Sequence, residues 1–287
     1  MNGPGVLVTG ATGTVGRAVV LELLAAGQRV RAGVRDLTEQ VPADVERVRL
    51  DFADPLTAGP ALVGVDRLFL LRPPSLSDVR TGMGPLVQAA ARQGLRRVVV
   101  LSVMGVNPAL PHWRMERMVR DAGLACTALR PAYFSQNLLT ALRADLQDRS
   151  QIRLAAGHGR VSFVDTRDVA AVAARVLTAP EAHAAEPLTL TGPAALSFDD
   201  AASLLTAELG RPVTYVRQGL LERRRELLGQ HAPSGYAWVQ LAIDVTTRLG
   251  LAAKVTDGVA RVLGRPATPL AQFVHDHRDA WLQPSDR

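Results

Sequence analysis

The feature that most constrains this chain is a run of glycines after an apolar segment near the N-terminus. Residues 6–8 are Val-Leu-Val, and the next eight residues, Thr9 to Gly16, read Thr-Gly-Ala-Thr-Gly-Thr-Val-Gly. The glycines stand at Gly10, Gly13 and Gly16. This spacing suits a buried strand that turns sharply into a helix, with no Cβ between the backbone and a pyrophosphate and with helix amides as donors. The sequence therefore predicts a dinucleotide-binding turn.

Strand and helix patterns alternate through the first half of the chain. Short apolar segments are expected to form strands, and the segments between them helices. The expected strands are 6–9, 30–34, 45–50, 67–71, 98–101 and 126–129, and the expected helices are 15–26, 55–63, 79–92 and 115–122. Wholly apolar strands are typical of parallel sheets covered on both faces. The pattern predicts an α/β fold, a Rossmann-type doubly wound parallel sheet.

The regular alternation ends at Pro131. Beyond it we expect helices at 137–146 and 167–177, a helix that begins at Ser197, strands at 152–155, 188–191 and 213–216, and mostly helix from residue 220. The expected organisation is a dinucleotide-binding domain over 1–155, to which 161–190 return, and a smaller, mostly helical substrate-binding lobe over 191–287.

Composition narrows the environment and the partners. The net charge is +6, but the basic residues are scattered arginines, with Lys254 as the only lysine, so we expect no nucleic-acid partner. No apolar run reaches the roughly 18 residues that a spanning helix needs, and we expect no membrane partner. The N-terminus shows no secretion signal, and a single cysteine, Cys126, forms no internal disulfide. We expect a cytoplasmic monomer or homodimer.

Residues after the expected strands are candidates to hold the rest of the cofactor. Arg35 ends the second strand, where an arginine favours the 2′-phosphate of NADP, and Asp36 leaves open the alternative of NAD. Asp51 and Phe52 are suited to the adenine edge. The complete set expected to bind NADP(H) is Gly10, Thr12, Gly13, Thr14, Val15, Gly16, Arg35, Asp51, Phe52, Leu71, Arg72, Ser102, Pro131 and Tyr133.

The glycine turn, the strand ending in Leu101-Ser102 and the segment Leu129-Arg130-Pro131 resemble the extended and atypical short-chain dehydrogenase/reductases. The NmrA-like branch is especially similar, a group that includes quinone reductases, triphenylmethane reductases and redox-sensing regulators. The resemblance covers roughly residues 5 to 190 and weakens over the C-terminal lobe. It implies an oxidoreductase that uses NADP(H).

The Tyr-x-x-x-Lys pair that does the acid-base work in that superfamily is missing. Tyr133, Tyr215 and Tyr236 are followed four residues later by Asn, Gly and Gln. At the matching place stands His112-Trp113-Arg114-Met115-Glu116, which is similar to the His-x-x-x-Glu of atypical members.

The resemblance makes Ser102 and His112 the candidate catalytic residues. Ser102 would hydrogen-bond the substrate oxygen, and His112 would supply a proton because imidazole titrates near neutrality. Two alternatives stay open. A phenol on the substrate can provide the proton itself, and His112 can be a helix-start residue bonded to a backbone carbonyl.

The substrate is expected to be a hydrophobic, flat aromatic molecule, because apolar side chains dominate the expected cleft. The candidate substrate residues are Met104, Trp113, Tyr133, Phe134 and Asn137, and no metal is expected. The first hypothesis is an NADPH-dependent ketone or quinone reductase acting on a polycyclic aromatic compound. A ketoreductase of aromatic polyketide antibiotic assembly, which handles phenolic ketones, would suit the missing Tyr and Lys. The resemblance, together with an Arg-rich composition typical of GC-rich actinobacterial genomes, suggests this role. The alternatives are a non-catalytic NADP(H) sensor and a broad quinone reductase.

Overall fold

The computed structural model describes residues 5–76, 78–229 and 234–282. The chain divides into two compact units. Unit 1 comprises Met1–Pro131, Thr166–Leu190 and Gly258–Arg265, and unit 2 comprises Ala132–Asp165, Thr191–Asp257 and Pro266–Arg287. This division differs from the expected one in three places. Residues 132–155 belong to unit 2, where 151–154 pair with 214–217. Residues 161–165, expected in the first domain, also belong to unit 2, and residues 258–265 return to unit 1.

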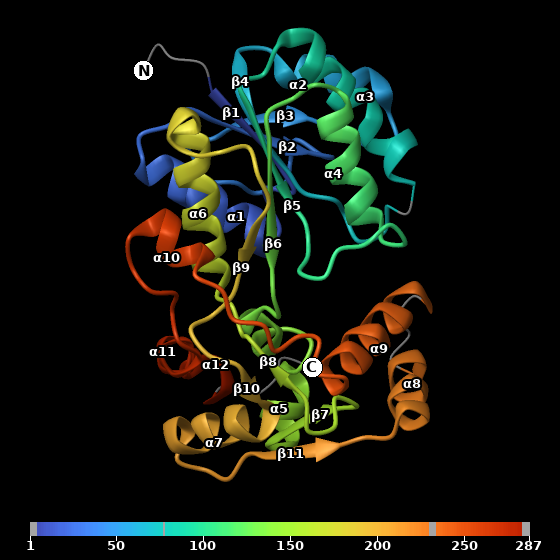
Figure 1. Ribbon diagram of the computed structural model, residues 1–287, viewed down its shortest axis with the longest axis vertical. Coiled ribbons are helices and arrows are strands. Elements are labelled where there is room, and N and C mark those ends of the chain that lie inside the picture. The colour runs from blue at the N-terminus through green and yellow to red at the C-terminus, as the bar shows by residue number, and fades with distance from the viewer. Residues whose placement is uncertain (1–4, 77, 230–233, 283–287) are drawn as a thin grey trace. The chain divides into compact units, whose positions relative to one another are not determined.

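A parallel sheet forms the centre of unit 1 (Figure 1). Over the described residues it has seven strands, in the order β3-β2-β1-β4-β5-β6-β9. Their bounds are β1 Gly5–Thr9, β2 Val30–Val34, β3 Glu46–Arg49, β4 Val65–Leu70, β5 Arg97–Leu101, β6 Cys126–Pro131 and β9 Leu188–Leu190. Each neighbouring pair is parallel. The strand order reverses between β1 and β4, and ligands of such sheets bind at this switch point, beyond the carboxyl ends of the strands.

Helices cover both faces of this sheet (Figure 1). One face carries α1 Thr14–Ala25, α6 Thr166–Thr178 and α10 Gly258–Leu263, with α6 packed against the other two. The opposite face carries α2 Ala58–Leu62, α3 Val79–Gln93 and α4 Pro111–Asp121. The doubly wound α/β fold predicted from the alternating pattern is confirmed.

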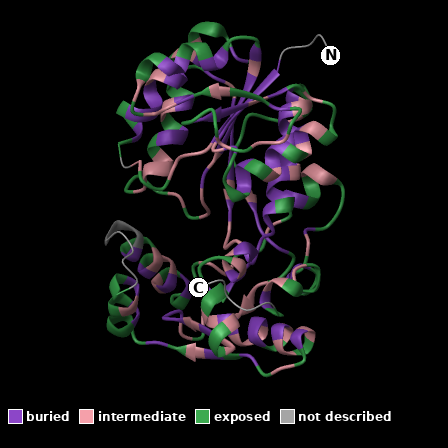
Figure 2. Ribbon diagram, turned by 180° about the vertical axis from the view of Figure 1, so that it is seen from behind, coloured by how far each residue is buried: buried purple, intermediate pink, exposed green. Residues whose placement is uncertain are grey.

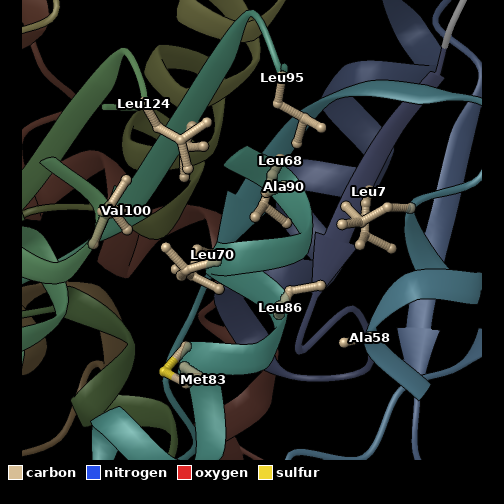
Figure 3. Packing of buried hydrophobic residues seen from close by; sticks show 14 of the residues in the cluster. Leu7, Ala58, Leu68, Leu70, Met83, Leu86, Ala90, Leu95, Val100 and Leu124 are labelled. Atoms are coloured by element: carbon tan, nitrogen blue, oxygen red, sulfur yellow. The ribbon is translucent and has the colours of Figure 1, made fainter. Parts of the chain in front are cut away.

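Apolar side chains from the sheet and from α2, α3 and α4 form one core cluster (Figure 3). Leu7 of β1, Leu70 of β4 and Val100 of β5 meet Met83 and Leu86 of α3 there. Figure 2 shows the central strands buried along their length, whereas the helices bury only the stripe that faces the sheet. This packing fixes the strand ends, and with them the loops that carry the expected cofactor residues.

Two helix boundaries differ from the sequence-based expectation. Helix α4 begins at Pro111, four residues before the expected start at Met115, because proline fits the first helical position, where its missing N–H is not needed. The expected helix over 137–146 is instead the 3₁₀ segment Ser135–Leu139 followed by α5 Arg143–Arg149. Thr140, with φ −122° and ψ −88°, interrupts the helical backbone between them.

Unit 2 contains two small sheets in its described part. Strand β7 Gln151–Leu154 pairs in parallel with β11 Thr214–Arg217, and β8 Arg160–Val161 pairs antiparallel with β10 Leu196–Ser197. Its longer helices are α7 Phe198–Leu209, α8 Leu220–Gly229 and α9 Ser234–Arg248, followed by the short α11 Leu270–Asp276 and α12 Asp279–Leu282. Among the described residues of the whole chain, no helix is long and apolar enough to cross a membrane.

Candidate functional site

The glycine turn joins β1 to α1 in unit 1. Gly10 has φ +63°, a left-handed conformation that favours glycine, and a Cβ on it would lie 2.9 Å from Leu71 Cδ2. A Cβ on Gly16 would lie only 2.0 Å from the carbonyl oxygen of Gly10. The backbone therefore takes this course because both positions lack a side chain.

The first turn of α1 is free to bind an anion. Gly13 is the N-cap residue and supplies no side-chain hydrogen bond, and no acidic residue stands in the first turn. The amides there, which Thr14, Val15 and Gly16 contribute, have no intrahelical acceptor by the geometry of a helix start. A turn without Cβ atoms beside such donors fits the pyrophosphate of a dinucleotide. The glycine turn can therefore hold NADP(H) as the sequence predicts.

Thr9 joins β1 to β4 directly beside this turn. Its buried hydroxyl donates to the Leu71 carbonyl at 3.2 Å and accepts from the Leu71 amide at 2.8 Å. The two bonds fasten the loop after β4 to the end of β1 at the switch point. This role of Thr9 was not predicted from the sequence, although a polar residue at the end of an otherwise apolar strand is a signal for it.

Three residues after β2 organise the place where the ribose end of a dinucleotide is expected. Arg35 and Asp36 are both exposed. The Asp36 carboxylate accepts from the Thr38 amide at 2.9 Å, so it is turned onto its own loop. The amides of Arg35 and Asp36 instead donate to Glu39 Oε1, at 3.0 and 3.2 Å. Glu39 was not predicted from the sequence as part of this site.

The loops after β3 and β4 are held by their own hydrogen bonds. Asp51 accepts from the Ala53 amide at 2.9 Å, and its own amide donates to Thr57 Oγ1 at 3.0 Å. Arg72 donates from one nitrogen to three carbonyls of its loop, those of Pro73, Pro74 and Leu76. Phe52 is half-buried and packs against the core cluster. The adenine and ribose roles expected for these residues stay predictions.

Ser102 lies just beyond β5 and bonds to a buried carboxylate on α4. Its hydroxyl lies 2.5 Å from Glu116 Oε1, and the Glu116 side chain is fully buried. Arg130 of β6 donates two hydrogen bonds to the same carboxylate, from Nε at 3.0 Å and from a terminal nitrogen at 2.6 Å. Burial alone would raise the pKa of Glu116, but the hydrogen bonds from Arg130 and Ser102 outweigh it and lower the pKa. The ionised carboxylate only accepts, so the Ser102 proton points to Glu116.

His112 stands in the first turn of α4. Burial, and next the nearby charge of Arg72, lower the pKa of His112 to about 4, against a smaller opposite effect of Glu116. Its Nδ1 is buried without a hydrogen-bond partner among the described residues. The imidazole is therefore neutral at pH 7 and is a poor source of a proton there. The backbone-carbonyl partner considered for it in the sequence analysis is not found at Nδ1.

Met104 and Trp113 belong to the same unit but have different surroundings. The Met104 amide donates to the Pro131 carbonyl at 2.9 Å, which joins the loops after β5 and β6. Trp113 packs under the Arg117 guanidinium, 5.4 Å from its ring centroid. It lines a hollow of about 760 Å³ between α3 and α4, together with Asp78 and Met118. The substrate roles of both residues stay predictions.

The remaining expected residues lie in unit 2. The Tyr133 ring meets Phe163 and Phe198 edge to face, with centroids 5.4 and 5.7 Å apart, and so joins an aromatic cluster of that unit's core. Phe134 forms an isolated β-bridge with Val164. The Asn137 carbonyl accepts hydrogen bonds from the amides of Thr140 and Leu142. The Tyr133 ring therefore packs within the core of unit 2, and the cofactor and substrate roles expected for this residue stay predictions.

Comparison with known proteins places the chain. A model of the NmrA-like family matches residues 4–237, which is most of the sequence. The chain belongs to the NmrA-like family. The resemblance predicted from the glycine turn and the strand ends is thus confirmed, and the match extends beyond residue 190 into the C-terminal part.

Individual relatives agree over nearly their full lengths. The NAD(P)H azoreductase of Xenophilus azovorans is 33% identical over 287 residues, which covers 96% of this chain and 99% of the relative. The triphenylmethane reductase of Citrobacter sp., solved with NADP(H), has a TM-score of 0.82 at 25% identity and covers 95% of this chain and 99% of its own. The NADPH-dependent quinone oxidoreductase QOR2 of Escherichia coli, solved with NADPH, gives 0.82 at 26%, with 94% and 99% covered.

Proposed function

We propose that this protein is an NADPH-dependent reductase that transfers hydride to a carbonyl or quinone of a hydrophobic polycyclic aromatic substrate. The comparisons confirm the general part of this proposal, which is the class of enzyme and its cofactor. The relatives are an azoreductase and a quinone oxidoreductase that use NAD(P)H, and two of the similar structures hold NADP(H). The chain is an NADP(H)-dependent oxidoreductase with a Rossmann-like sheet. The class of substrate is the part that we propose.

The observation that carries the proposal is that the candidate proton donors of unit 1 are not in a donating state. The Ser102 proton is directed to Glu116, and His112 is neutral at pH 7. A Tyr-x-x-x-Lys pair does not exist in the sequence. When bound, NADPH supplies a hydride, so the acceptor must tolerate the negative charge that arrives with it.

Hydride acceptors differ strongly in the basicity of the anion that their reduction creates. Reduction of an isolated ketone creates an alkoxide, an anion about as basic as hydroxide, which water protonates but which is costly to form without a proton donor. Reduction of a quinone creates a phenolate-like anion, whose pKa is about 10, like that of a tyrosine side chain. A phenol beside a ketone offers an internal proton to the same effect. The site therefore favours quinones and phenolic ketones over plain ketones.

The narrower proposal is the one that the missing Tyr and Lys, the family resemblance and the composition suggested, a ketoreductase step on a phenolic aromatic polyketide. It is compatible with the same reasoning, because such substrates carry a hydroxyl beside the carbonyl. A broad quinone reductase is the alternative within the same chemistry. The breadth of accepted substrates separates the two.

The test is a panel of acceptors with the purified protein and NADPH. We expect consumption of NADPH with a naphthoquinone such as menadione and with 1-acetyl-2-naphthol, and none above background with 1-acetylnaphthalene, which lacks the phenol. Turnover of 1-acetylnaphthalene as fast as its hydroxylated analogue would contradict the proposal. Tight binding of NADPH without oxidation by any acceptor would instead support a cofactor sensor.

A further inference from the structure

The Glu39 carboxylate occupies a set of hydrogen-bond donors that meets at the end of β2. Its Oε1 accepts from the amides of Arg35 and Asp36, at 3.0 and 3.2 Å, and its Oε2 accepts from Thr12 Oγ1 at 2.9 Å. The Arg35 charge acts on the same carboxylate. The donors therefore come from two loops, the glycine turn after β1 and the loop after β2, and Glu39 bridges them.

The loop that carries Glu39 is fastened in place. The Glu39 amide donates to the Asp36 carbonyl at 3.0 Å. The Arg47 guanidinium donates to the Leu37 carbonyl at 3.1 Å and reaches the Glu39 carbonyl at 3.5 Å. These bonds hold the backbone and leave the Glu39 side chain free to turn about its own torsions. The carboxylate can thus be displaced without rebuilding the loop.

In folds of this type the end of the second strand faces the adenosine 2′ position. A 2′-phosphate needs donors and positive charge, whereas a 2′-hydroxyl needs an acceptor. The donors on this spot are already taken by an anionic side chain. A carboxylate beside a phosphate is repulsive, but a carboxylate beside a ribose hydroxyl is a hydrogen-bond acceptor.

We propose that Glu39 sets the balance between NADPH and NADH in this protein. Its carboxylate occupies the donors that a 2′-phosphate requires, so NADPH has to displace it, while the 2′-hydroxyl of NADH can donate to it where it lies. Arg35 favours NADPH and Glu39 favours NADH, at the same place. This inference rests on the proposed binding of the dinucleotide at the glycine turn.

The test compares binding of both cofactors to the protein without added cofactor, by titration calorimetry. In Glu39→Gln we expect the ratio of the NADH to the NADPH dissociation constant to rise roughly tenfold, which is the scale of one charge-assisted hydrogen bond at a partly exposed site. Binding of adenosine 2′,5′-bisphosphate relative to 5′-AMP should change in the same direction, because these fragments differ only in the 2′-phosphate.

The matched control is Asp44→Asn, which removes one negative charge from the same connection between β2 and β3. Asp44 is exposed and makes no hydrogen bond or ion pair within the described part of the chain. We expect Asp44→Asn to leave the ratio unchanged. Glu39→Ala should repeat the effect of Glu39→Gln, and the melting temperature identifies any variant that fails to fold.

The outcomes separate the two proposals. An unchanged ratio in both Glu39 variants, with both cofactors still bound, would overturn the role of Glu39 and leave the proposed function intact. An equal change in Asp44→Asn would also overturn it, because general charge would then be the cause. Failure of the unaltered protein to bind either cofactor would reject the proposed function itself.

Discussion

Ser102 and Glu116 share a hydrogen bond of 2.5 Å between the end of β5 and the second turn of α4. Arg130 of β6 holds the other side of the carboxylate, so three elements of unit 1 meet at one fully buried charge. The cluster fixes the carboxyl ends of two adjacent strands. It also withdraws the serine that the family resemblance offered as a partner of the substrate oxygen.

Glu116→Ala should strongly destabilise unit 1. Removing Glu116 leaves the Arg130 guanidinium without its carboxylate partner. Because the Arg130 side chain is partly exposed, we expect the lower end of the range for a broken buried pair, a loss of about 3 kcal/mol in the free energy of unfolding. Urea denaturation measures the change. The control is Asp121→Ala on the same helix, where the Arg117–Asp121 pair is exposed and its loss lowers stability by less than about 1 kcal/mol. Equal effects of the two variants would contradict the assigned network.

The same carboxylate gives stability a defined pH dependence. The pKa of Glu116 is lower in the folded protein than its usual value of 4.5. Its contribution is therefore fully present above pH 4.5 and is lost as the pH falls through the lower pKa of the folded state. Denaturation followed from pH 6 downward should show a shallower loss in Glu116→Gln than in the unaltered protein, although Glu116→Gln starts from a lower stability. Parallel curves would exclude this contribution.

His112→Gln should leave most of the reductase activity. A neutral imidazole with a pKa of about 4 does not act as a general acid at pH 7. We expect kcat/KM to stay within about threefold of the unaltered protein, far from the ~100-fold loss that removal of a general acid causes. The pH profile between 5 and 8 should show no inflection that belongs to His112. An inflection near pH 6.5 that disappears in His112→Gln would assign the proton to this residue.

Arg35→Ala should weaken the binding of NADPH far more than the binding of NADH. The planar guanidinium can donate two parallel hydrogen bonds to a phosphate. Its removal should therefore raise the KM for NADPH roughly tenfold, with little change in the KM for NADH. Initial rates with each cofactor measure this. Arg49→Ala, an exposed arginine of the neighbouring strand β3, serves as the control for a lost surface charge. An equal rise in both KM values in Arg35→Ala would reject Arg35 as the discriminating residue.

Gly16→Ala should disable the cofactor turn. The added Cβ would fall 2.0 Å from the Gly10 carbonyl oxygen, so the turn must open, at a cost of about 1–3 kcal/mol and with loss of NADPH binding. Gly59→Ala on α2 meets nothing within 4 Å and should change stability by no more than about 0.5 kcal/mol. Melting temperature and NADPH titration compare the two. Normal NADPH affinity in Gly16→Ala would show that the turn does not hold the cofactor.

The sheet and the glycine turn were predictable because each rests on local pattern. The apolar strands, and the turn formed by Gly10, Gly13 and Gly16, are determined by residues that lie close together in the sequence. Ser197 was likewise predicted to open a helix, and it forms a capping box with Asp200. Helix boundaries were less accurate where one residue decides them, as Pro111 does for α4.

Contacts between distant side chains were not predictable. Glu116 was noticed only as part of a pattern with His112, yet it faces Ser102 and Arg130, each 14 residues away. Glu39 lies in a polar loop whose sequence is typical of surface. Its role depends on Thr12, 27 residues earlier, and the sequence contains no signal for that pairing. The direction of a side chain is set by the packed fold and not by spacing along the chain.

The two hydrogen bonds between Thr9 and Leu71 make the Leu71 amide a useful probe for hydrogen exchange. The Leu71 amide is bonded to the buried Thr9 hydroxyl, so its hydrogen exchanges with solvent when the loop after β4 separates from the end of β1. Exchange at this amide therefore records opening of the junction between β1 and the loop after β4, whereas exchange at the Arg35 and Asp36 amides follows the release of Glu39. A single deuterium-exchange experiment can thus distinguish a variant that opens this junction from one that only frees the loop after β2.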